Sequence, residues 1–271
     1  MPSAESAGIY HKRRCTVYRN CIIVIFTALF FLLNSHAFAG SFKAVPVRLF
    51  VDVKSKTAVL RIVNQGDNRV TVQLDAKSWQ QDETGQDIYE ETGDIIFFPK
   101  ITTLEKGEER IIRIGYRGKQ EQVEKTYRLF MQELPVTESG GMALQLALTI
   151  TIPIFVEPEK AEKAAWIAET AGLSDEALRI KVRNNSNRHI VVSRITAVGL
   201  DESGREVFSK NAAGWYTLAQ TSRIYAVPIP YEECLKVKTI RVKTDLEKDS
   251  KTFTLDVGKE MCTRKPESEK K

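Results

Sequence analysis

The chain has 271 residues, of which 42% are hydrophobic and 28% charged, and its formal net charge at pH 7 is +5. This length suits one or two domains once a leader has been removed. The basic residues form no clustered footprint of the kind that nucleic-acid-binding proteins carry, so we expect no nucleic-acid partner.

The amino terminus has the order of a secretory signal peptide. Basic residues at 11–14 precede an apolar run at 21–33, and residues 37–39 offer the small side chains that signal peptidase requires. The run of about 13 residues is short for a bilayer crossing, although a retained membrane anchor is the alternative. We therefore expect cleavage of residues 1–39 and export from the cytoplasm. Cleavage would remove four basic residues and one acidic residue, which lowers the net charge from +5 to +2.

The rest of the chain predicts β-structure throughout. Short runs rich in Val, Ile, Thr and aromatic residues alternate with turns rich in Gly, Asn, Asp and Pro. In chain order, the expected strands are 57–63, 70–74, 110–116, 127–134, 142–155, 178–182, 190–198, 239–243 and 252–257. Only residues 159–166 have a helical pattern.

A charged, proline-flanked stretch at 158–163 indicates a domain boundary. Seven residues of the first half recur 119 positions later, which supports two similar halves. Chance or turns of the same kind are the alternative cause. Val63, Asn68, Arg69, Val72, Asp82, Glu83 and Gly85 recur as Val182, Asn187, Arg188, Val191, Asp201, Glu202 and Gly204. We predict an all-β protein of two tandem immunoglobulin-like β-sandwich domains, at 40–158 and 159–271.

Four cysteines are present, and two of them, Cys15 and Cys21, lie in the expected leader. Cys234 and Cys262 would then remain in an oxidising compartment. They are symmetric about position 248, in the turn of the expected hairpin, so they can meet. The sequence predicts a disulfide between them, with two free thiols as the alternative.

His189 is the one histidine outside the expected leader. A Ser/His/Asp triad or a histidine zinc site would have to be built around it, and the sequence has neither a Gly-x-Ser-x-Gly nor a His-Glu-x-x-His motif. We therefore expect no enzymatic activity, metal, cofactor or small-molecule substrate.

Large apolar residues occupy every second position from Met142 to Ile152. Such alternation places them on one face of a strand, although the pattern alone is also typical of an ordinary half-buried core strand. The apolar face carries Met142, Leu144, Leu146, Leu148, Ile150 and Ile152. The other face carries Ala143, Gln145, Ala147, Thr149 and Thr151.

An ordered series of motifs resembles the PapD-like chaperones of the chaperone-usher pathway. The motifs are AVPVRL at 44–49, LRIVNQG at 60–66, WQQ at 79–81, Gly85, Pro99, LEKGE at 104–108, RI at 113–114, YRL at 127–129 and ELP at 133–135. The resemblance implies a periplasmic chaperone with two domains in an L-shaped arrangement. Such a chaperone caps pilus subunits by donor-strand complementation and delivers them to an outer-membrane usher.

The resemblance also implies which residues form the donor strand. In these chaperones, a strand of the first domain fills the groove of a subunit that lacks its final strand. Leu144, Leu146 and Leu148 match the donor positions, with Met142 and Ile150 as extensions. We expect this face to be open to solvent in the free chain and the neighbouring Ala147 to point into the core.

The same family anchors the subunit's terminal carboxylate between two basic residues. Arg48 matches one of them, but the partner lysine falls at Pro153 and a nearby family arginine at Glu157, so the sequence departs from that pattern. The run at 152–156 instead resembles the archaic, or sigma-type, branch. In that branch Arg128 could supply the second charge, because arginine binds both carboxylate oxygens. The alternative is a structural salt bridge from Arg128 to Glu133 or another acid.

A secreted adhesin or carbohydrate-binding sandwich is the alternative function. It would need exposed aromatic platforms. Trp79, Trp166 and Trp215 are scattered in the sequence, so we expect them in core or hinge packing.

Overall fold

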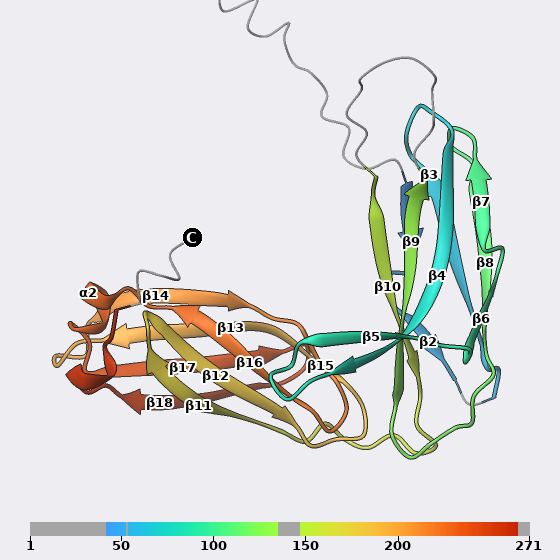
Figure 1. The fold of residues 1–271 in the computed structure, drawn as a ribbon. Coiled ribbons are helices and arrows are strands. Elements are labelled where there is room, and N and C mark those ends of the chain that lie inside the picture. Colours follow the sequence, from blue (N-terminus) through green and yellow to red (C-terminus); the bar gives the residue numbers. More distant parts are fainter. Residues whose placement is uncertain (1–41, 53, 135–146, 265–271) are drawn as a thin grey trace, which may run out of the picture. The chain divides into compact units, whose positions relative to one another are not determined.

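The computed structural model describes residues 42–52, 54–134 and 147–264, which all belong to one unit, residues 41–271 (Figure 1). The expectations for the leader at 1–39 and for Met142, Leu144 and Leu146 therefore lie outside the described residues. None of the helices in the described ranges has the length and hydrophobicity needed to span a bilayer.

The first β-sandwich is built from strands β1 to β10. One sheet has the order β1-β3-β8-β6, and the other has the order β2-β10-β9-β4-β5, with β7 also paired to β4. The strands are β1 (Phe42–Val45), β2 (Leu49–Val51), β3 (Thr57–Asn64), β4 (Val70–Gln81), β5 (Asp87–Glu91), β6 (Ile95–Phe98), β7 (Ile101–Leu104), β8 (Glu109–Tyr116), β9 (Lys125–Leu134) and β10 (Thr149–Val156). Alternate residues of both sheets fill one core, as the period of two predicts.

The second β-sandwich is built from strands β11 to β18 (Figure 1). Its sheets have the orders β11-β12-β16 and β14-β13-β17-β18, and β15 also pairs with β13. The strands are β11 (Trp166–Ser174), β12 (Ala177–Asn184), β13 (Ile190–Leu200), β14 (Glu206–Ala213), β15 (Tyr216–Thr217), β16 (Ser222–Pro228), β17 (Thr239–Leu246) and β18 (Ser250–Asp256). This all-β architecture of two sandwiches confirms the predicted fold class. The L-shaped arrangement and the boundary between residues 158 and 159 stay predictions.

Two polar side chains in each sandwich have equivalent roles. Asp82 and Asp201 each accept the backbone N–H groups two and four residues further on, at 2.8–2.9 Å and 2.8–3.0 Å, and so shape matching hairpin turns. The amides of Asn64 and Asn184 each donate to three backbone carbonyls. Asn64 and Asn184 are 120 residues apart, whereas Asp82 and Asp201 are 119 apart, because the second sandwich has one residue fewer between the asparagine and the aspartate.

The helix expected at 159–166 does not form, because its backbone groups have partners elsewhere. Residues up to Ala165 are irregular, and Trp166 begins β11. The side-chain amide of Asn187 donates to the carbonyl of Lys160 at 2.8 Å and accepts the N–H of Glu162 at 3.1 Å. These bonds replace the bonds to the fourth preceding residue that a helix would need. In the described ranges, helical segments are α2 (Tyr231–Cys234) and the 3-10 turn η1 (Lys259–Met261).

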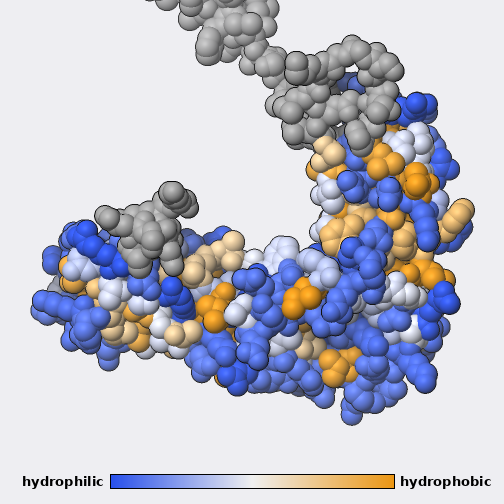
Figure 2. All heavy atoms as spheres, in the orientation of Figure 1, coloured by the Kyte–Doolittle hydropathy of each residue, from blue (hydrophilic) through white to orange (hydrophobic). Residues whose placement is uncertain are grey.

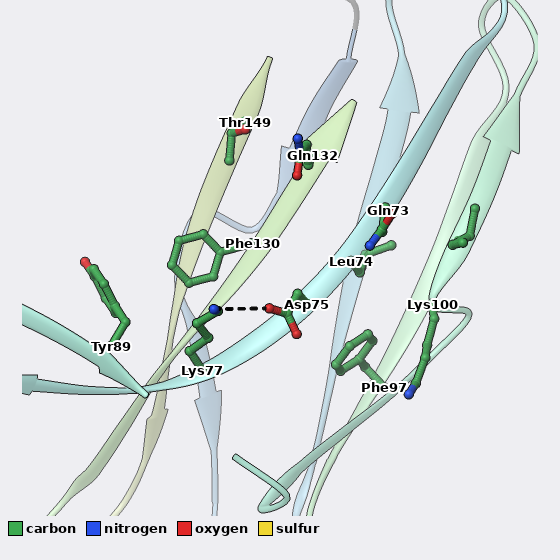
Figure 3. A pocket seen from close by; sticks show the side chains of 11 residues that line it. Gln73, Leu74, Asp75, Lys77, Tyr89, Phe97, Lys100, Phe130, Gln132 and Thr149 are labelled. Carbon is green, nitrogen blue, oxygen red and sulfur yellow. Dashed lines mark ion pairs between the residues drawn. The ribbon is translucent and has the colours of Figure 1, made fainter. Parts of the chain in front are cut away.

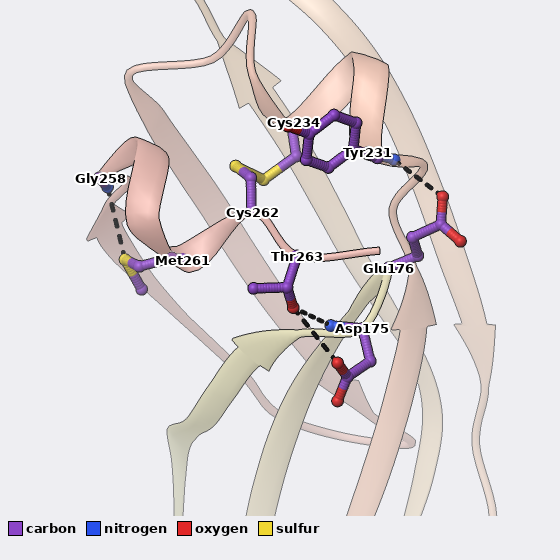
Figure 4. The surroundings of a disulfide bond; sticks show 8 residues. All are labelled: Asp175, Glu176, Tyr231, Cys234, Gly258, Met261, Cys262 and Thr263. Atoms are coloured by element: carbon purple, nitrogen blue, oxygen red, sulfur yellow. Dashed lines mark hydrogen bonds between the residues drawn. A yellow bond between two sulfur atoms is a disulfide. The ribbon is translucent and has the colours of Figure 1, made fainter. Parts of the chain in front are cut away.

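The predicted disulfide between Cys234 and Cys262 is present (Figure 4). It joins the end of α2 to the segment after η1, with the two Cα atoms 5.8 Å apart. Next to it, the hydroxyl of Thr263 accepts the N–H of Asp175 at 2.7 Å. The bridge and this hydrogen bond together fasten the end of the described chain to the second sandwich.

We expect the double substitution Cys234→Ser and Cys262→Ser to destabilise the second sandwich by about 3–4 kcal/mol, because it releases a long loop in the unfolded chain. Urea unfolding monitored by tryptophan fluorescence, with Trp166 and Trp215 in the second sandwich, measures the loss. The transition of the first sandwich, reported by Trp79, is the internal control. An unchanged unfolding midpoint for the second sandwich would contradict a stabilising role for the bridge.

Candidate functional site

Strand β10 forms an open edge over part of its length. It pairs with β9 along all of Thr149–Val156, whereas β2 joins its other side only at Ile154–Val156. In the described part of the chain, Thr149–Pro153 therefore has a strand on one side only. An edge of this kind presents unpaired main-chain groups that a further strand can bind.

The phase of the ladder identifies the main-chain groups that point outward. The N–H of Glu133 donates to the carbonyl of Leu148 at 2.9 Å, so these opposed residues form a hydrogen-bonded pair. Because such pairs alternate along an antiparallel ladder, Ile150 and Ile152 also bond to β9. The main-chain groups of Thr149 and Thr151 therefore point away from β9. Pro153 also belongs to the residues whose main-chain groups point away from β9. Its missing N–H therefore costs no hydrogen bond between β10 and β9.

The apolar face of β10 continues the core of the first sandwich. Ile154 is 0% exposed and Ile152 3%, and Leu148 and Ile150, nearer the strand's start, are partly buried against the same core. Cover thus decreases toward the start of the strand, and the apolar side chains there keep part of their surface in solvent.

The expectation that Ala147 points into the core is wrong. Ala147 is exposed, as are Thr149 and Thr151, and the large apolar residues face inward instead. The alternating pattern separates two faces but carries no information about which face the opposite sheet covers, so the sequence left this choice open.

The two predicted anchor residues, Arg48 and Arg128, both lie near the ring of Tyr216. Arg48 immediately precedes β2, whose Leu49 lies opposite Ile154, and Arg128 lies directly opposite Pro153. The guanidinium carbons of Arg48 and Arg128 lie 5.6 and 5.5 Å from the ring centroid of Tyr216. Arg128 therefore stands next to the position where the family's lysine would be.

Arg128 is a buried cation in an aromatic enclosure. It is 3% exposed, and its guanidinium carbon lies 3.8 Å from the ring centroid of Trp79 and 5.3 Å from that of Trp215. Its Nε and Nη2 atoms are buried without a hydrogen-bond partner. Burial lowers the pKa of Arg128. Cation–π contacts offset part of the desolvation cost, but the unsatisfied donors suit a ligand that carries an anionic acceptor.

The salt bridge considered as the alternative role of Arg128 is not observed. No carboxylate oxygen lies within 4.0 Å of its guanidinium nitrogens in residues 42–52, 54–134 and 147–264. Asp87 is one of the acids that attract Arg128 electrostatically, and it instead pairs with Arg223 at 3.5 Å.

Arg48 differs from Arg128 in having an acidic partner. Its Nη2 lies 2.6 Å from Oε1 of Glu247, which follows β17. Hydrogen bonding to Glu247 raises the pKa of Arg48. Its side chain is 34% exposed, so a ligand can approach the guanidinium from solvent.

The aromatic residues around the arginines are held from both sandwiches. Trp79, Phe155 and Leu218 form a small buried cluster, and Tyr216 packs against it. The amide of Gln81 donates to the carbonyl of Tyr216 at 3.0 Å. The indole N–H of Trp215 donates to Asp87 at 2.9 Å. These contacts fix β15 and Trp215 beside Arg128.

His189 is held by ring stacking and by contacts with one carboxylate. Its ring is stacked on Phe155 with the centroids 3.7 Å apart, and its Nδ1 lies 2.7 Å from Oε2 of Glu124. The same carboxylate oxygen accepts the backbone N–H of His189 at 2.8 Å. Glu124 is buried and His189 is partly buried, and the pair links the segment before β9 to the segment before β13.

The sequence analysis missed Tyr216, Trp215 and Glu247 as members of this site. They come from β15 and two turns of the second sandwich. No local pattern distinguishes them, because only tertiary contacts place them near arginines that are far away in sequence. Trp79 and Trp166 are buried, as expected for packing, and Trp215 is 41% exposed.

A groove of about 660 Å³ lies on the outer face of the sheet that contains β4 and β9 (Figure 3). Tyr89 and Phe130 line it, with ring planes at 89° to each other. Rings at right angles do not form the single flat platform that a sugar ring stacks on. On the face seen in Figure 2, hydrophobic patches are separated by hydrophilic surface. Neither feature favours the carbohydrate-binding alternative.

Comparison with known proteins identifies the first sandwich. A family model described as the pili and flagellar-assembly chaperone, PapD N-terminal domain, matches residues 41–162. This match runs from β1 to the segment after β10. No curated protein sequence matches the chain significantly.

Solved structures share the fold of both sandwiches. A chain of the CsuC–CsuE chaperone–tip adhesion subunit pre-assembly complex from archaic chaperone-usher pili of Acinetobacter baumannii is 17% identical, with a TM-score of 0.56, and the match covers 84% of this chain and 100% of that one. A chain of the Salmonella enterica SafA pilin–SafB chaperone complex is 15% identical, with a TM-score of 0.56 and coverage of 82% and 100%. The E. coli chaperone DraB is 18% identical, with a TM-score of 0.52 and coverage of 80% and 98%.

Identities this low show the fold alone, so the placement in the archaic branch stays a prediction. The family match of the first sandwich and the fold that both sandwiches share with pilus chaperones lead to the same assignment. The first sandwich belongs to the PapD-like family of pilus-assembly chaperones, and both sandwiches have the fold of solved pilus chaperones.

Proposed function

We propose that this chain captures pilus subunits in the periplasm by donor-strand complementation and delivers them to an outer-membrane usher. The observation that carries the proposal is the open edge of β10 at Thr149–Pro153, beside a partly exposed apolar face. An incoming strand can pair with the outward main-chain groups of Thr149 and Thr151. The CsuC–CsuE and SafA–SafB structures are chaperone–subunit complexes, which supports this mode of action.

The apolar side chains of the donor strand would supply the contacts with the subunit core. Leu148 and Ile150 belong to this set, and the predicted Met142, Leu144 and Leu146 precede them in sequence. A fully exposed side chain of this size contributes about 1.5–3 kcal/mol when buried. Since Leu148 and Ile150 are already partly buried against the chain's own core, their contribution is smaller.

Arg48 and Arg128 are proposed to bind the subunit's terminal carboxylate. A carboxylate above Pro153 would lie between the strands that carry the two arginines. Arg128 would satisfy its unpaired donors, and Arg48 offers a solvent-accessible guanidinium. Charge-assisted hydrogen bonds of this type are about twice as strong as neutral ones.

The experiment is affinity purification of the tagged full-length chain from the periplasm of a pilus-producing host. We expect a small subunit to co-purify in a one-to-one complex and the chain to begin at Gly40. Recovery of only the free chain from such a host would contradict subunit capture. An amino terminus at Met1 would contradict the predicted cleavage without affecting the capture result.

A further inference from the structure

Arg48 forms an ion pair with a carboxylate of its own chain. Glu247, in the turn between β17 and β18, places Oε1 2.6 Å from Nη2 of Arg48. The hydrogen bond from Arg48 lowers the pKa of Glu247, so this partner is ionised at neutral pH. A second carboxylate bound at Arg48 would face the negative charge of Glu247 at close range. The two carboxylates therefore compete for one guanidinium.

The pair is open enough for exchange. The side chains of Arg48 and Glu247 are 34% and 45% exposed, so water reaches both partners of the pair. Exposed ion pairs are weak because water solvates both partners after separation. A displaced Glu247 can therefore return to solvent at little cost. Arg128, by contrast, is buried, and in the described part of the chain no carboxylate lies within salt-bridge distance of it.

The turn that carries Glu247 is fixed to the second sandwich. The N–H of Leu246 donates to the carbonyl of Asp249 at 2.8 Å, which closes the turn. The carboxylate of Asp249 accepts the indole N–H of Trp166 at 2.8 Å. A displaced Glu247 side chain therefore stays within reach of Arg48. A tethered competitor of this kind acts at a high effective concentration.

We propose that Glu247 is a resident counter-ion that competes with the subunit's terminal carboxylate for Arg48 and thereby speeds release of the subunit. The inference rests on the function proposed above. It assigns opposite roles to two acidic groups at one arginine: the subunit carboxylate strengthens capture, and Glu247 makes capture reversible. A chaperone that passes its subunit to another protein needs both capture and release.

The first test is the release rate of the co-purified subunit from the wild-type chain and from Glu247→Gln. Each complex is mixed with a tenfold excess of labelled free wild-type chain, and transfer of the subunit is followed. We expect release from Glu247→Gln to be about two- to fivefold slower, which corresponds to the loss of one exposed ion pair. Glu232→Gln is the matched control, because it removes an exposed ion pair that lies within the second sandwich and away from Arg48, with Arg264 at 2.9 Å. Its release rate should equal that of the wild type.

A second arm needs no subunit. N-acetylglycine, a small carboxylate, and N-acetylglycinamide, its neutral analogue, are titrated into the free full-length chain while the NMR signal of the Arg48 side-chain N–H is observed. We expect N-acetylglycine to bind Glu247→Gln about two- to fivefold more tightly than the wild type, and the amide to bind neither. Equal affinities, or no response of Arg48 to the carboxylate in either chain, would overturn the competition. Failure of the wild-type chain to form a subunit complex would instead overturn the proposed function. The two failures can be told apart because the titration with N-acetylglycine needs no subunit.

Discussion

Replacing Thr151 with proline is expected to reduce subunit capture by about 10- to 100-fold and to leave the chain folded. The N–H of Thr151 points away from β9, so its removal costs no bond within the sheet. Pro153 already occupies the same kind of position two residues later. In the complex, however, the subunit carbonyl facing Thr151 would lose its donor and stay buried, which costs about 1–3 kcal/mol.

The control for this prediction is Ile152→Pro. Ile152 bonds to β9 and is buried, so its replacement should unfold the first sandwich. Ala147→Glu is a second control, because an exposed substitution should change stability by no more than about 0.5 kcal/mol. Thermal melts and pull-downs of a subunit separate these outcomes. Normal capture by a folded Thr151→Pro chain would rule out pairing at this edge.

Replacing Arg48 with alanine is expected to weaken subunit capture by about 2–5 kcal/mol, because the subunit's carboxylate would be left uncompensated in a partly buried site. The fold should persist, since the exposed pair of Arg48 with Glu247 contributes only about 0–1 kcal/mol. Native pull-downs measure capture and urea unfolding measures stability. Wild-type levels of co-purified subunit would refute the anchor assignment.

Arg128→Met tests the second anchor in the same assays. The substitution removes a buried cation whose Nε and Nη2 donors are unsatisfied, so stability should be unchanged or higher, whereas capture should fall as it does for Arg48→Ala. If capture is unchanged, Arg128 is not an anchor. If the chain unfolds, its contact with Trp79 is a structural requirement.

Several features could be predicted from the sequence because they depend on local patterns. The alternation of apolar residues predicts the long strands β3, β8 and β9 closely. The cysteine pair follows from counting residues after the predicted leader, and the structure contains that bridge. The two arginines came from an ordered series of motifs, and the structure places both beside Tyr216.

Short strands and irregular segments were harder to predict. β2, β7 and β15 have two to four residues each, too few for a period of two to be recognised, and their neighbours in the sheet stabilise them. The helix expected at 159–166 does not form because contacts with distant residues decide the structure of this segment as well. Its charged residues are good helix formers, but hydrogen bonds to Asn187 outweigh that weak local preference.

The sequence by itself therefore determined the β-rich class, the two halves and the disulfide partners, because each depends on residue type and spacing along the chain, whereas the candidate arginines followed from the resemblance to a known family. Only the tertiary structure decided that Leu148 and Ile150 face the core, that Arg128 is enclosed by Trp79 and Trp215, and that Glu247 occupies Arg48. The first feature depends on which face of β10 the opposite sheet of the first sandwich covers, and the other two depend on contacts between the two sandwiches. Contacts between residues far apart in sequence leave no periodic signal in either segment, because each segment's pattern reflects only its own backbone geometry.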